Sequence, residues 1–234
     1  MLLSELIQRS PIRIFAQAIN GGLIAGEMGI IAAPSGIGKT SVLVQIALDK
    51  LLQGKKVIHI SFTQHTDYVL VWYKDIFNEF IKKRNLEDAK DVKSEVEKNR
   101  VLMKFNQEGL TVEQILKSVR ALIKDGGFNA DSVIVDGLNF AAVKEDHIAA
   151  FKTFAEEMGV SIWFSCTVKG EEPFYDKRNT PLVVKDYADR FEVIVVLEPK
   201  QDNITLTVSR SRDARVSESP ALKLDPKTLL ILEN

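Results

Sequence analysis

GIIAAPSGIGKTSVLV, residues 29–44, joins an apolar run, a group of small residues, a lysine with two hydroxyl residues, and a second apolar run. Residues 28–33 are predicted to form a buried strand, because the run is short and almost wholly apolar. Residues 38–52 are predicted to form a helix, since their apolar side chains recur at helical spacing. The small residues therefore connect a strand to the N-terminus of a helix.

The connection reads APSGIGKT from Ala33, which is the spacing of a Walker A phosphate loop with alanine where glycine usually comes first. Glycines let the backbone wrap a phosphate with its N–H groups pointing inward, and the helix adds its positive N-terminal end. A tight turn alone would not need the Gly-Lys-Thr trio. We expect Lys39 to neutralise the β- and γ-phosphates and the Thr40 hydroxyl to bind Mg²⁺. The predicted phosphate-binding residues are Pro34, Ser35, Gly36, Ile37, Gly38, Lys39, Thr40 and Ser41.

A second candidate for this site is Asp136, which ends the apolar run SVIVD. In nucleotide hydrolases with a phosphate loop, an aspartate at a strand end close to the loop holds Mg²⁺. An aspartate in this position is also an ordinary strand terminator or helix cap. Because the phosphate loop is already present, we expect Asp136 and Thr40 to share the metal.

The rest of the chain alternates between predicted strands and helices. Strands are predicted at residues 57–62, 100–106, 131–137, 160–166, 191–198 and 204–210, and helices at 67–83, 86–99, 111–126 and 146–158. Residues 221–232 are predicted to form two short strands around an Asp-Pro turn. This order favours an α/β fold with a mostly parallel central sheet flanked by helices, and with antiparallel strands at the C-terminal edge. We expect one domain over residues 1–234, with 1–20 as an N-terminal lead-in.

Composition argues against several classes of protein. A net charge of -1 and a pI of about 6.3 give no global positive field that would attract nucleic acid or an anionic membrane. The single cysteine, Cys166, cannot form an internal disulfide, and no metal-site spacing is present, so a reducing, cytoplasmic setting is expected. The sequence predicts neither a membrane span nor a signal peptide.

One longer stretch carries a family resemblance. Residues 21–41, GGLIAGEMGIIAAPSGIGKTS, resemble the entrance to the RecA-like ATPase core shared by replicative hexameric helicases, the circadian-clock ATPase KaiC and RadA-type recombinases. Residues 177–198, KRNTPLVVKDYADRFEVIVVLE, are similar to the segment that leads into a late strand of the helicase core. The resemblance implies a RecA-like fold, ATP and Mg²⁺ as ligands, and ATP hydrolysis. It also implies nucleotide bound at the seam between subunits, and hence a homo-oligomer, either a hexamer or a filament.

The chain departs from that family at two catalytic positions. The family's catalytic glutamate, at the end of the second strand, falls on Thr63 or, one residue later, on Gln64. Neither is a carboxylate base, but glutamine can orient an attacking water, so Gln64 is a candidate catalytic residue for slow hydrolysis. The γ-phosphate-sensing glutamine of the helicases is replaced by Cys166 or Thr167. The sequence therefore predicts ATP binding with slow or impaired turnover.

Two arginines, Arg210 and Arg212, resemble a basic pair that in this family reaches the γ-phosphate held by the next subunit. Strand alternation would place both on the same buried face as Val208, and buried guanidinium groups need an anion. Both are therefore candidate catalytic residues that act in trans. The alternative is a strand end that frays into solvent, with Asp213 as a local partner.

The loop at residues 169–181 offers a candidate nucleic-acid strip, formed by Lys169, Lys177, Arg178, Phe174 and Tyr175. Acidic neighbours weaken this interpretation and favour a solvated or protein-binding loop. The favoured function is a regulatory or assembly ATPase whose nucleotide occupancy sets its contacts with other subunits or with a protein partner. A nucleic-acid-dependent motor is the chief alternative. A small-molecule phosphotransferase and a subunit that no longer binds nucleotide are less favoured.

Overall fold

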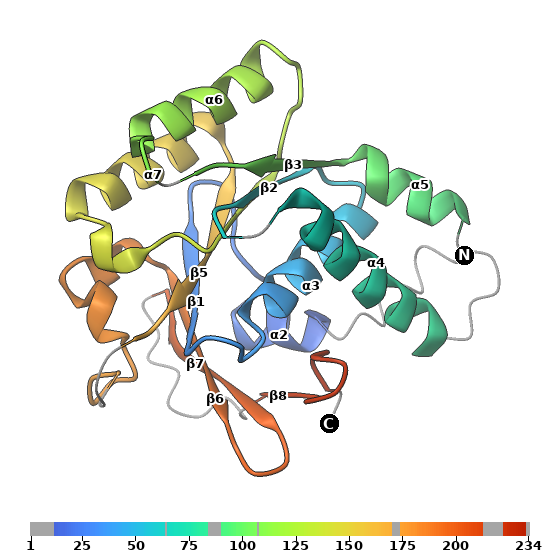
Figure 1. The fold of residues 1–234 in the computed structure, drawn as a ribbon, viewed down its shortest axis with the longest axis vertical. Coiled ribbons are helices and arrows are strands. Elements are labelled where there is room, and N and C mark those ends of the chain that lie inside the picture. The colour runs from blue at the N-terminus through green and yellow to red at the C-terminus, as the bar shows by residue number, and fades with distance from the viewer. Residues whose placement is uncertain are drawn as a thin grey trace.

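The computed structural model describes residues 12–63, 65–83, 90–106, 108–169, 174–212 and 222–232. In these ranges eight strands form one sheet, in the spatial order β3-β2-β4-β5-β1-β6-β7-β8 (Figure 1). All pairs among β1 to β6 are parallel, whereas β6-β7 and β7-β8 are antiparallel. The strands are β1 (Met28–Ala33), β2 (Val57–Ser61), β3 (Arg100–Lys104), β4 (Ser132–Asp136), β5 (Ser161–Thr167), β6 (Val193–Pro199), β7 (Ile204–Ser211) and β8 (Leu222–Leu224). The prediction of an α/β fold with a mostly parallel sheet is confirmed, and the arrangement is that of a RecA-like domain.

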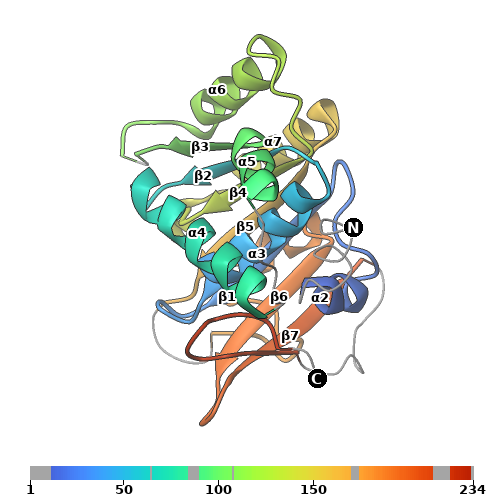
Figure 2. The ribbon, with the colours of Figure 1, turned by 90° about the vertical axis from the view of Figure 1, so that its right-hand side faces the viewer.

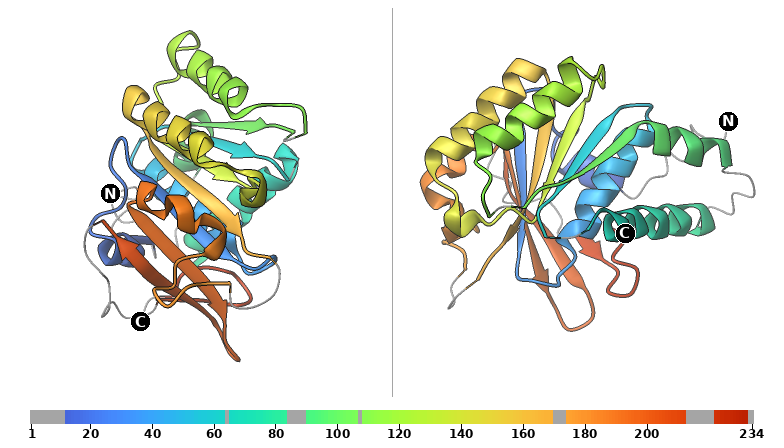
Figure 3. Two further views of the ribbon diagram at one scale, coloured as in Figure 1. Left: turned by 90° about the vertical axis from the view of Figure 1, so that its left-hand side faces the viewer. Right: turned by 45° about the horizontal axis from the view of Figure 1, so that its top comes forward.

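Helices cover both faces of the sheet (Figure 2 and Figure 3). Because successive strand residues point to opposite faces, the apolar side chains form two clusters. In β1, for example, Ile31 belongs to the first cluster and Ile30 to the second. The first face carries α2 (Ile12–Ala18), α3 (Lys39–Leu52), α4 (Thr66–Lys83) and α5 (Lys90–Lys98). The second carries α6 (Val112–Lys124), α7 (Glu145–Met158) and the 3-10 helices η1 (Phe140–Ala142) and η2 (Leu182–Arg190).

Helix α3 lies at the centre of the first face, between the sheet and helices α2 and α4 (Figure 1). Nearly all of its residues are buried, including the polar Gln45 and Asp49. A helix that is buried on most sides needs apolar residues around most of its circumference, which explains the run VLVQIAL at residues 42–48. Within the described ranges, no helix is both long enough and apolar enough to cross a membrane.

The predicted elements are found within three residues of their predicted ends, with some exceptions. The helix predicted at residues 86–99 is α5, and residues 84–89 lie outside the described ranges. Residues 182–190, to which no element was assigned, form η2. The second of the two strands predicted in residues 221–232 is reduced to an isolated bridge between Leu224 and Ile231.

An irregularity in β7 changes the interpretation of its arginines. Ile194 of β6 pairs with Arg210, but the next β6 residue, Val195, pairs with Val208, so Ser209 is an extra residue in β7. Such a bulge shifts the alternation of side chains by one position. Arg210 therefore shares the face of Ile194, on the side of the second cluster, and Val208 faces the first cluster. The prediction that Arg210 continues the buried row of Val208 is wrong.

Candidate nucleotide site

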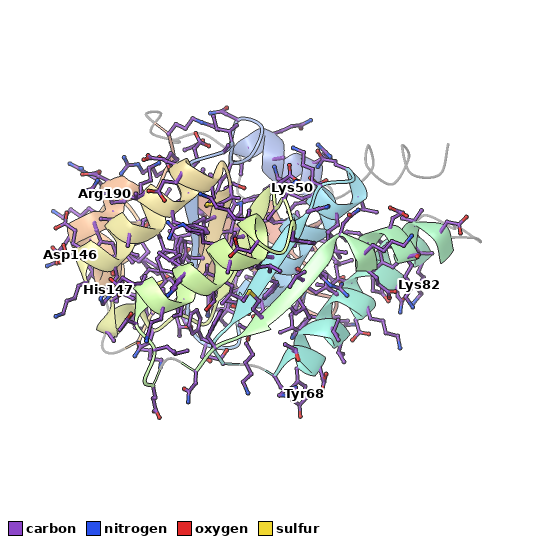
Figure 4. All side chains as sticks on the ribbon, turned by 90° about the horizontal axis from the view of Figure 1, so that it is seen from above. Lys50, Tyr68, Lys82, Asp146, His147 and Arg190 are labelled. Carbon is purple, nitrogen blue, oxygen red and sulfur yellow. The ribbon has the colours of Figure 1, made fainter. Side chains whose placement is uncertain are left out.

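A cleft of about 530 Å³ lies at the carboxyl edge of the sheet, where the parallel strands end. Figure 4 labels Tyr68, in the first turn of α4 at this edge, and Lys50, near the end of α3 at the opposite, amino edge. The cleft is bounded by the loop after β1, the ends of β4 and β5, and the segment that follows β2. Most of the predicted phosphate-loop residues line it, namely Ser35, Gly36, Gly38, Lys39, Thr40 and Ser41.

The start of α3 has the geometry of an anion site. Gly38 precedes the helix with φ of +99°, a backbone conformation that glycine adopts without strain. No side-chain hydrogen bond caps this helix start, so its positive N-terminal end faces the cleft uncapped. Two predicted residues do not line the cleft, since Ile37 packs against the first apolar cluster and Pro34 contributes its carbonyl to Lys39. The backbone is therefore arranged for a phosphate group.

The Lys39 side chain is buried against the loop that it belongs to. Its Nζ donates hydrogen bonds to the carbonyls of Ala33, at 3.1 Å, and Pro34, at 2.7 Å. Burial lowers the pKa of the Lys39 ammonium, and the nearby carboxylate of Asp136 opposes that shift. An ammonium held by neutral carbonyls in a desolvated place gains more from an anionic partner than one in water. A triphosphate supplies such a partner.

Thr40 and Asp136, the two predicted Mg²⁺ ligands, are in direct contact. The Thr40 hydroxyl donates to Asp136 Oδ2 at 2.8 Å, and the Ser165 hydroxyl donates to Asp136 Oδ1 at 2.6 Å. Ser165 Oγ in turn accepts from the backbone N–H of Gly137 at 2.8 Å. The described residues contain no group of three or more His, Cys, Asp and Glu that would form a metal cage. One carboxylate with a hydroxyl fits Mg²⁺, which keeps several waters and completes its shell with phosphate oxygens.

Thr63, one of the two candidates for the position of the family's catalytic glutamate, lines the cleft and is exposed. Thr63 sits close to the end of β4, because Gly137 has no side chain. A Cβ on Gly137 would lie 2.6 Å from Thr63 Oγ1. Gln64, the other candidate for this role, lies outside the described residues.

At the end of β5, the two candidates for the γ-phosphate-sensing position differ in where their side chains lie. Thr167 lines the cleft, whereas Cys166 points into the second apolar cluster and is fully buried. Burial raises the pKa of the Cys166 thiol to about 12, and nearby Lys39 opposes the shift. Cys166 is therefore a core residue, and of the two candidates Thr167 is the one that faces the cleft.

The two candidate arginines lie at the amino edge, far from the cleft of their own chain, and they differ in their partners. Arg212 donates to both carboxylate oxygens of Glu27, at 2.9 and 3.0 Å, and to the carbonyls of Ile19, Asn20 and Gly22. Arg210 donates to Asp189, whose side chain is 97% exposed, at 2.7 Å. Arg212 thus holds residues 19–27 against the end of β7, and Arg210 has a partner that solvent can replace.

The loop proposed as a nucleic-acid strip does not present its aromatic rings. Phe174 and Tyr175 are partly buried against the second apolar cluster. Stacking on single-stranded nucleic acid needs exposed ring faces, so this observation weighs against the strip. Residues 170–173 of the loop lie outside the described ranges.

Several residues of the cleft were not predicted as site residues, among them Trp72, Ser165, Lys169 and Leu229. Ser165 could have been found from its place on the same strand face as Thr167, two residues away. Lys169 was assigned instead to the candidate nucleic-acid strip in the loop at residues 169–181. Trp72 of α4 and Leu229 near the C-terminus reach the cleft through the packing of α3, and no local pattern in the sequence marks them.

Comparisons with known proteins agree with this geometry. A family model described as an AAA domain (AAA_25) matches residues 4–163, well over half of the chain, including the phosphate loop and Asp136. The chain is also similar to the "DNA repair protein RadA" of Aquifex aeolicus (strain VF5), with 46% identity over 44 residues. That match covers 19% of this chain and spans 10% of the relative's length. The protein belongs to the AAA domain family, and its fold places it in the RecA-like superfamily of phosphate-loop ATPases.

Proposed function

We propose that this protein binds ATP with Mg²⁺ and acts in the cytoplasm as a regulatory or assembly ATPase with slow hydrolysis. The observation that carries the proposal is the composition of the cleft. Among its described lining residues Asp136 is the only carboxylate, and both of its oxygens already accept hydrogen bonds from Thr40 and Ser165. No described carboxylate remains there to act as the general base for water.

Binding follows from the residues in place. The uncapped start of α3 and the Lys39 ammonium attract the phosphates, and Lys39 exchanges its loop carbonyls for phosphate oxygens. Thr40 and Asp136 would hold Mg²⁺, which neutralises charge on the β- and γ-phosphates when bound. The lining hydroxyls of Thr63 and Thr167 offer hydrogen bonds near the γ-phosphate but no strong base. The site therefore favours retention of ATP over its hydrolysis.

The proposal includes a homo-oligomer, hexamer or filament, in which Arg210 of one subunit serves the nucleotide of the next. Arg210 lies at the amino edge and the cleft at the carboxyl edge, so a head-to-tail contact is needed to bring them together. Its weakly held partner, the exposed Asp189, can be exchanged for a phosphate oxygen. Nucleotide occupancy would then control assembly or the binding of a protein partner.

Steady-state release of phosphate from Mg·ATP tests the proposal, with Lys39→Ala as the blank and direct nucleotide binding measured in parallel. The expected result is clear ATP binding by the wild type with phosphate release at or barely above the blank. A turnover rate typical of a working motor, on the order of 10 per second, contradicts slow hydrolysis. Absence of binding contradicts the whole proposal.

A nucleic-acid-dependent motor is the second candidate, and the similarity to a relative named as a DNA repair protein favours it. Single-stranded DNA added to the same assay separates the two. We expect no stimulation, because the net charge is -1 and the aromatic rings of the loop are partly buried. Stimulation of phosphate release by DNA would favour the motor, and Gln64 would then be the first residue to substitute.

A further inference from the structure

Leu229 has a backbone conformation that a bulky residue rarely adopts. Its φ is +55°, in the left-handed region, which is unfavourable for a side chain with a Cβ. Such strain persists only where surrounding contacts enforce it, and it often marks a functional position. The residue follows the turn at Asp225, whose carbonyl accepts the Leu229 N–H at 2.7 Å.

The contacts that enforce this conformation come from α3, directly after the phosphate loop. Leu229 O accepts hydrogen bonds from Ser41 Oγ and from Gln45 Nε2, both at 2.9 Å. Gln45 Oε1 accepts the N–H of Ile231 at 3.0 Å. Ser41 and Gln45 are fully buried, so these polar groups have no water to replace a lost partner. The C-terminal turn is thus fixed to the helix that begins the nucleotide site.

The result is that the Leu229 side chain stands over the phosphate loop. Its Cδ2 would lie 3.5 Å from a Cβ placed on Gly38, and Leu229 lines the same cleft as Lys39 and Thr40. A long apolar side chain in a polar phosphate site has no charge to offer to phosphate. It is suited to contact an apolar part of a ligand.

The positions of Thr40 and Ser41 show which part of a nucleotide this would be. Successive residues of a helix point about 100° apart. Thr40 points to Asp136, which marks the metal and the γ-phosphate end, whereas Ser41 points to Leu229. With the γ-phosphate at the Asp136 side, the nucleoside leaves the phosphate loop on the side of Leu229.

We infer that Leu229 is the apolar wall on which the nucleoside of the bound nucleotide packs, and that the Ser41–Gln45 clamp on the C-terminal turn positions it. The inference rests on the proposed nucleotide binding and extends it. An apolar side chain does not read the hydrogen-bonding edge of a base, so Leu229 raises affinity for ATP and GTP alike. The turn, and not the phosphate loop alone, sets how tightly a nucleoside triphosphate is held.

The test compares two ligands in three proteins by calorimetric titration. The ligands are Mg·ATP and Mg·tripolyphosphate, which has the three phosphates but no nucleoside. The proteins are the wild type, Leu229→Gly, which accepts the φ of +55° and removes the side chain, and Leu229→Met, which keeps a flexible apolar side chain. We expect Leu229→Gly to weaken ATP binding about tenfold and to leave tripolyphosphate binding unchanged. Leu229→Met should bind both ligands as the wild type does.

Other outcomes are equally informative. Equal weakening of ATP and tripolyphosphate binding in Leu229→Gly would mean that Leu229 supports the phosphate loop only. Unchanged ATP binding in this variant would mean that Leu229 does not contact the bound nucleotide. Either result overturns the inference. A wild type that binds no ATP, whether or not it binds tripolyphosphate, refutes the proposed function itself, and the inference with it.

Discussion

Charged side chains at the two edges of the parallel sheet have different kinds of partner, as Lys39, Asp136 and Arg212 show. At the carboxyl edge, Lys39 and Asp136 are buried and held by uncharged groups, carbonyls in one case and hydroxyls in the other. At the amino edge, Arg212 is bound to Glu27 at 2.9 Å and to three carbonyls. Among the described residues, Lys39 and Asp136 thus have no ion-pair partner within hydrogen-bonding distance, whereas Arg212 has one.

A second charged side chain at the amino edge, Lys152, is also held by a carboxylate and a carbonyl. Lys152 of α7 donates to Glu192 at 2.7 Å and to the carbonyl of Gly26, and Glu192 also accepts the N–H of Met28. These contacts connect α7 and the start of β6 to the start of β1. Paired charges of this kind are structural, whereas a buried charge held by neutral groups is suited to a ligand of opposite charge. By this criterion Lys39 and Asp136 are better candidates for ligand binding than Arg212 and Lys152 are.

The largest effect is expected from adding a charge to the carboxyl edge. Thr63→Glu places a carboxylate in the cleft, at one of the two positions to which the family resemblance assigns the catalytic glutamate. We expect phosphate release to rise on the order of 100-fold over the wild type, because a positioned general base contributes at least that much. Thr63→Gln, similar in size but unable to accept a proton, is the control. No increase with Thr63→Glu would mean that the missing carboxylate does not limit turnover.

The next largest effects are expected from removing one charged side chain at each edge, Arg212 at the amino edge and Lys39 at the carboxyl edge. Arg212→Ala should lower the free energy of unfolding by about 2–3 kcal/mol, because the half-buried Glu27 and the carbonyls lose their donor. Its affinity for Mg·ATP should be that of the wild type. Lys39→Ala should show the reverse, with ATP binding weakened about 10- to 100-fold and stability preserved. Chemical denaturation and nucleotide titration of both variants measure the contrast, and a stability loss in Lys39→Ala as large as in Arg212→Ala would contradict it.

The parts of the site that lie in one continuous motif were predictable from the sequence. The phosphate loop needs glycines, a lysine and a hydroxyl at fixed spacing, so Lys39 and Thr40 could be assigned directly. Asp136 followed because it ends a strand that the fold class places near that loop. The parallel sheet with its antiparallel edge followed from the alternation of elements.

The rest could not be predicted, for two physical reasons. Residues that reach the cleft from separate elements, such as Trp72 and Leu229, are brought there by tertiary packing, which leaves no periodic trace in the sequence. A bulge inserts one residue without changing composition, so Ser209 could not be recognised as the point where the faces of β7 exchange. The strain at Leu229 is equally invisible, since leucine is an unusual choice for positive φ.

Between the two edges, His59 of β2 shows a third way to bury an ionisable group, which is to keep it neutral. Its Nδ1 lies 3.1 Å from the hydroxyl of Tyr73, and its Nε2 has no hydrogen-bond partner among the described residues. Burial lowers the pKa of His59 to about 4, against the opposing effect of Asp136. The unfolded chain, with an ordinary histidine pKa of about 6.5, therefore binds this proton first as the pH falls.

Protonation of the unfolded state removes stability between pH 6.5 and 4, so stability should fall as the medium becomes acidic. From pH 7 to pH 5, we expect His59 to account for a loss of about 2 kcal/mol in the free energy of unfolding. In His59→Gln, whose amide retains a partner for Tyr73, this part of the pH dependence should disappear. Denaturant titrations at both pH values measure it, and equal slopes in the two proteins would refute the assignment.

The smallest effect on stability is expected from Arg210, the amino-edge arginine whose partner is exposed. Arg210→Ala should change Tm by less than about 2 °C, because a pair with an exposed aspartate contributes little. If Arg210 acts on the next subunit, the variant should still reduce phosphate release, and Thr63→Glu provides a background in which release is measurable. Mixing Arg210→Ala with Lys39→Ala subunits in that background should restore part of the activity. At some interfaces the first subunit then supplies an intact nucleotide site with Lys39, and its neighbour supplies Arg210. A mixture that is no more active than its components would mean that Arg210, like Arg212, has a structural role only.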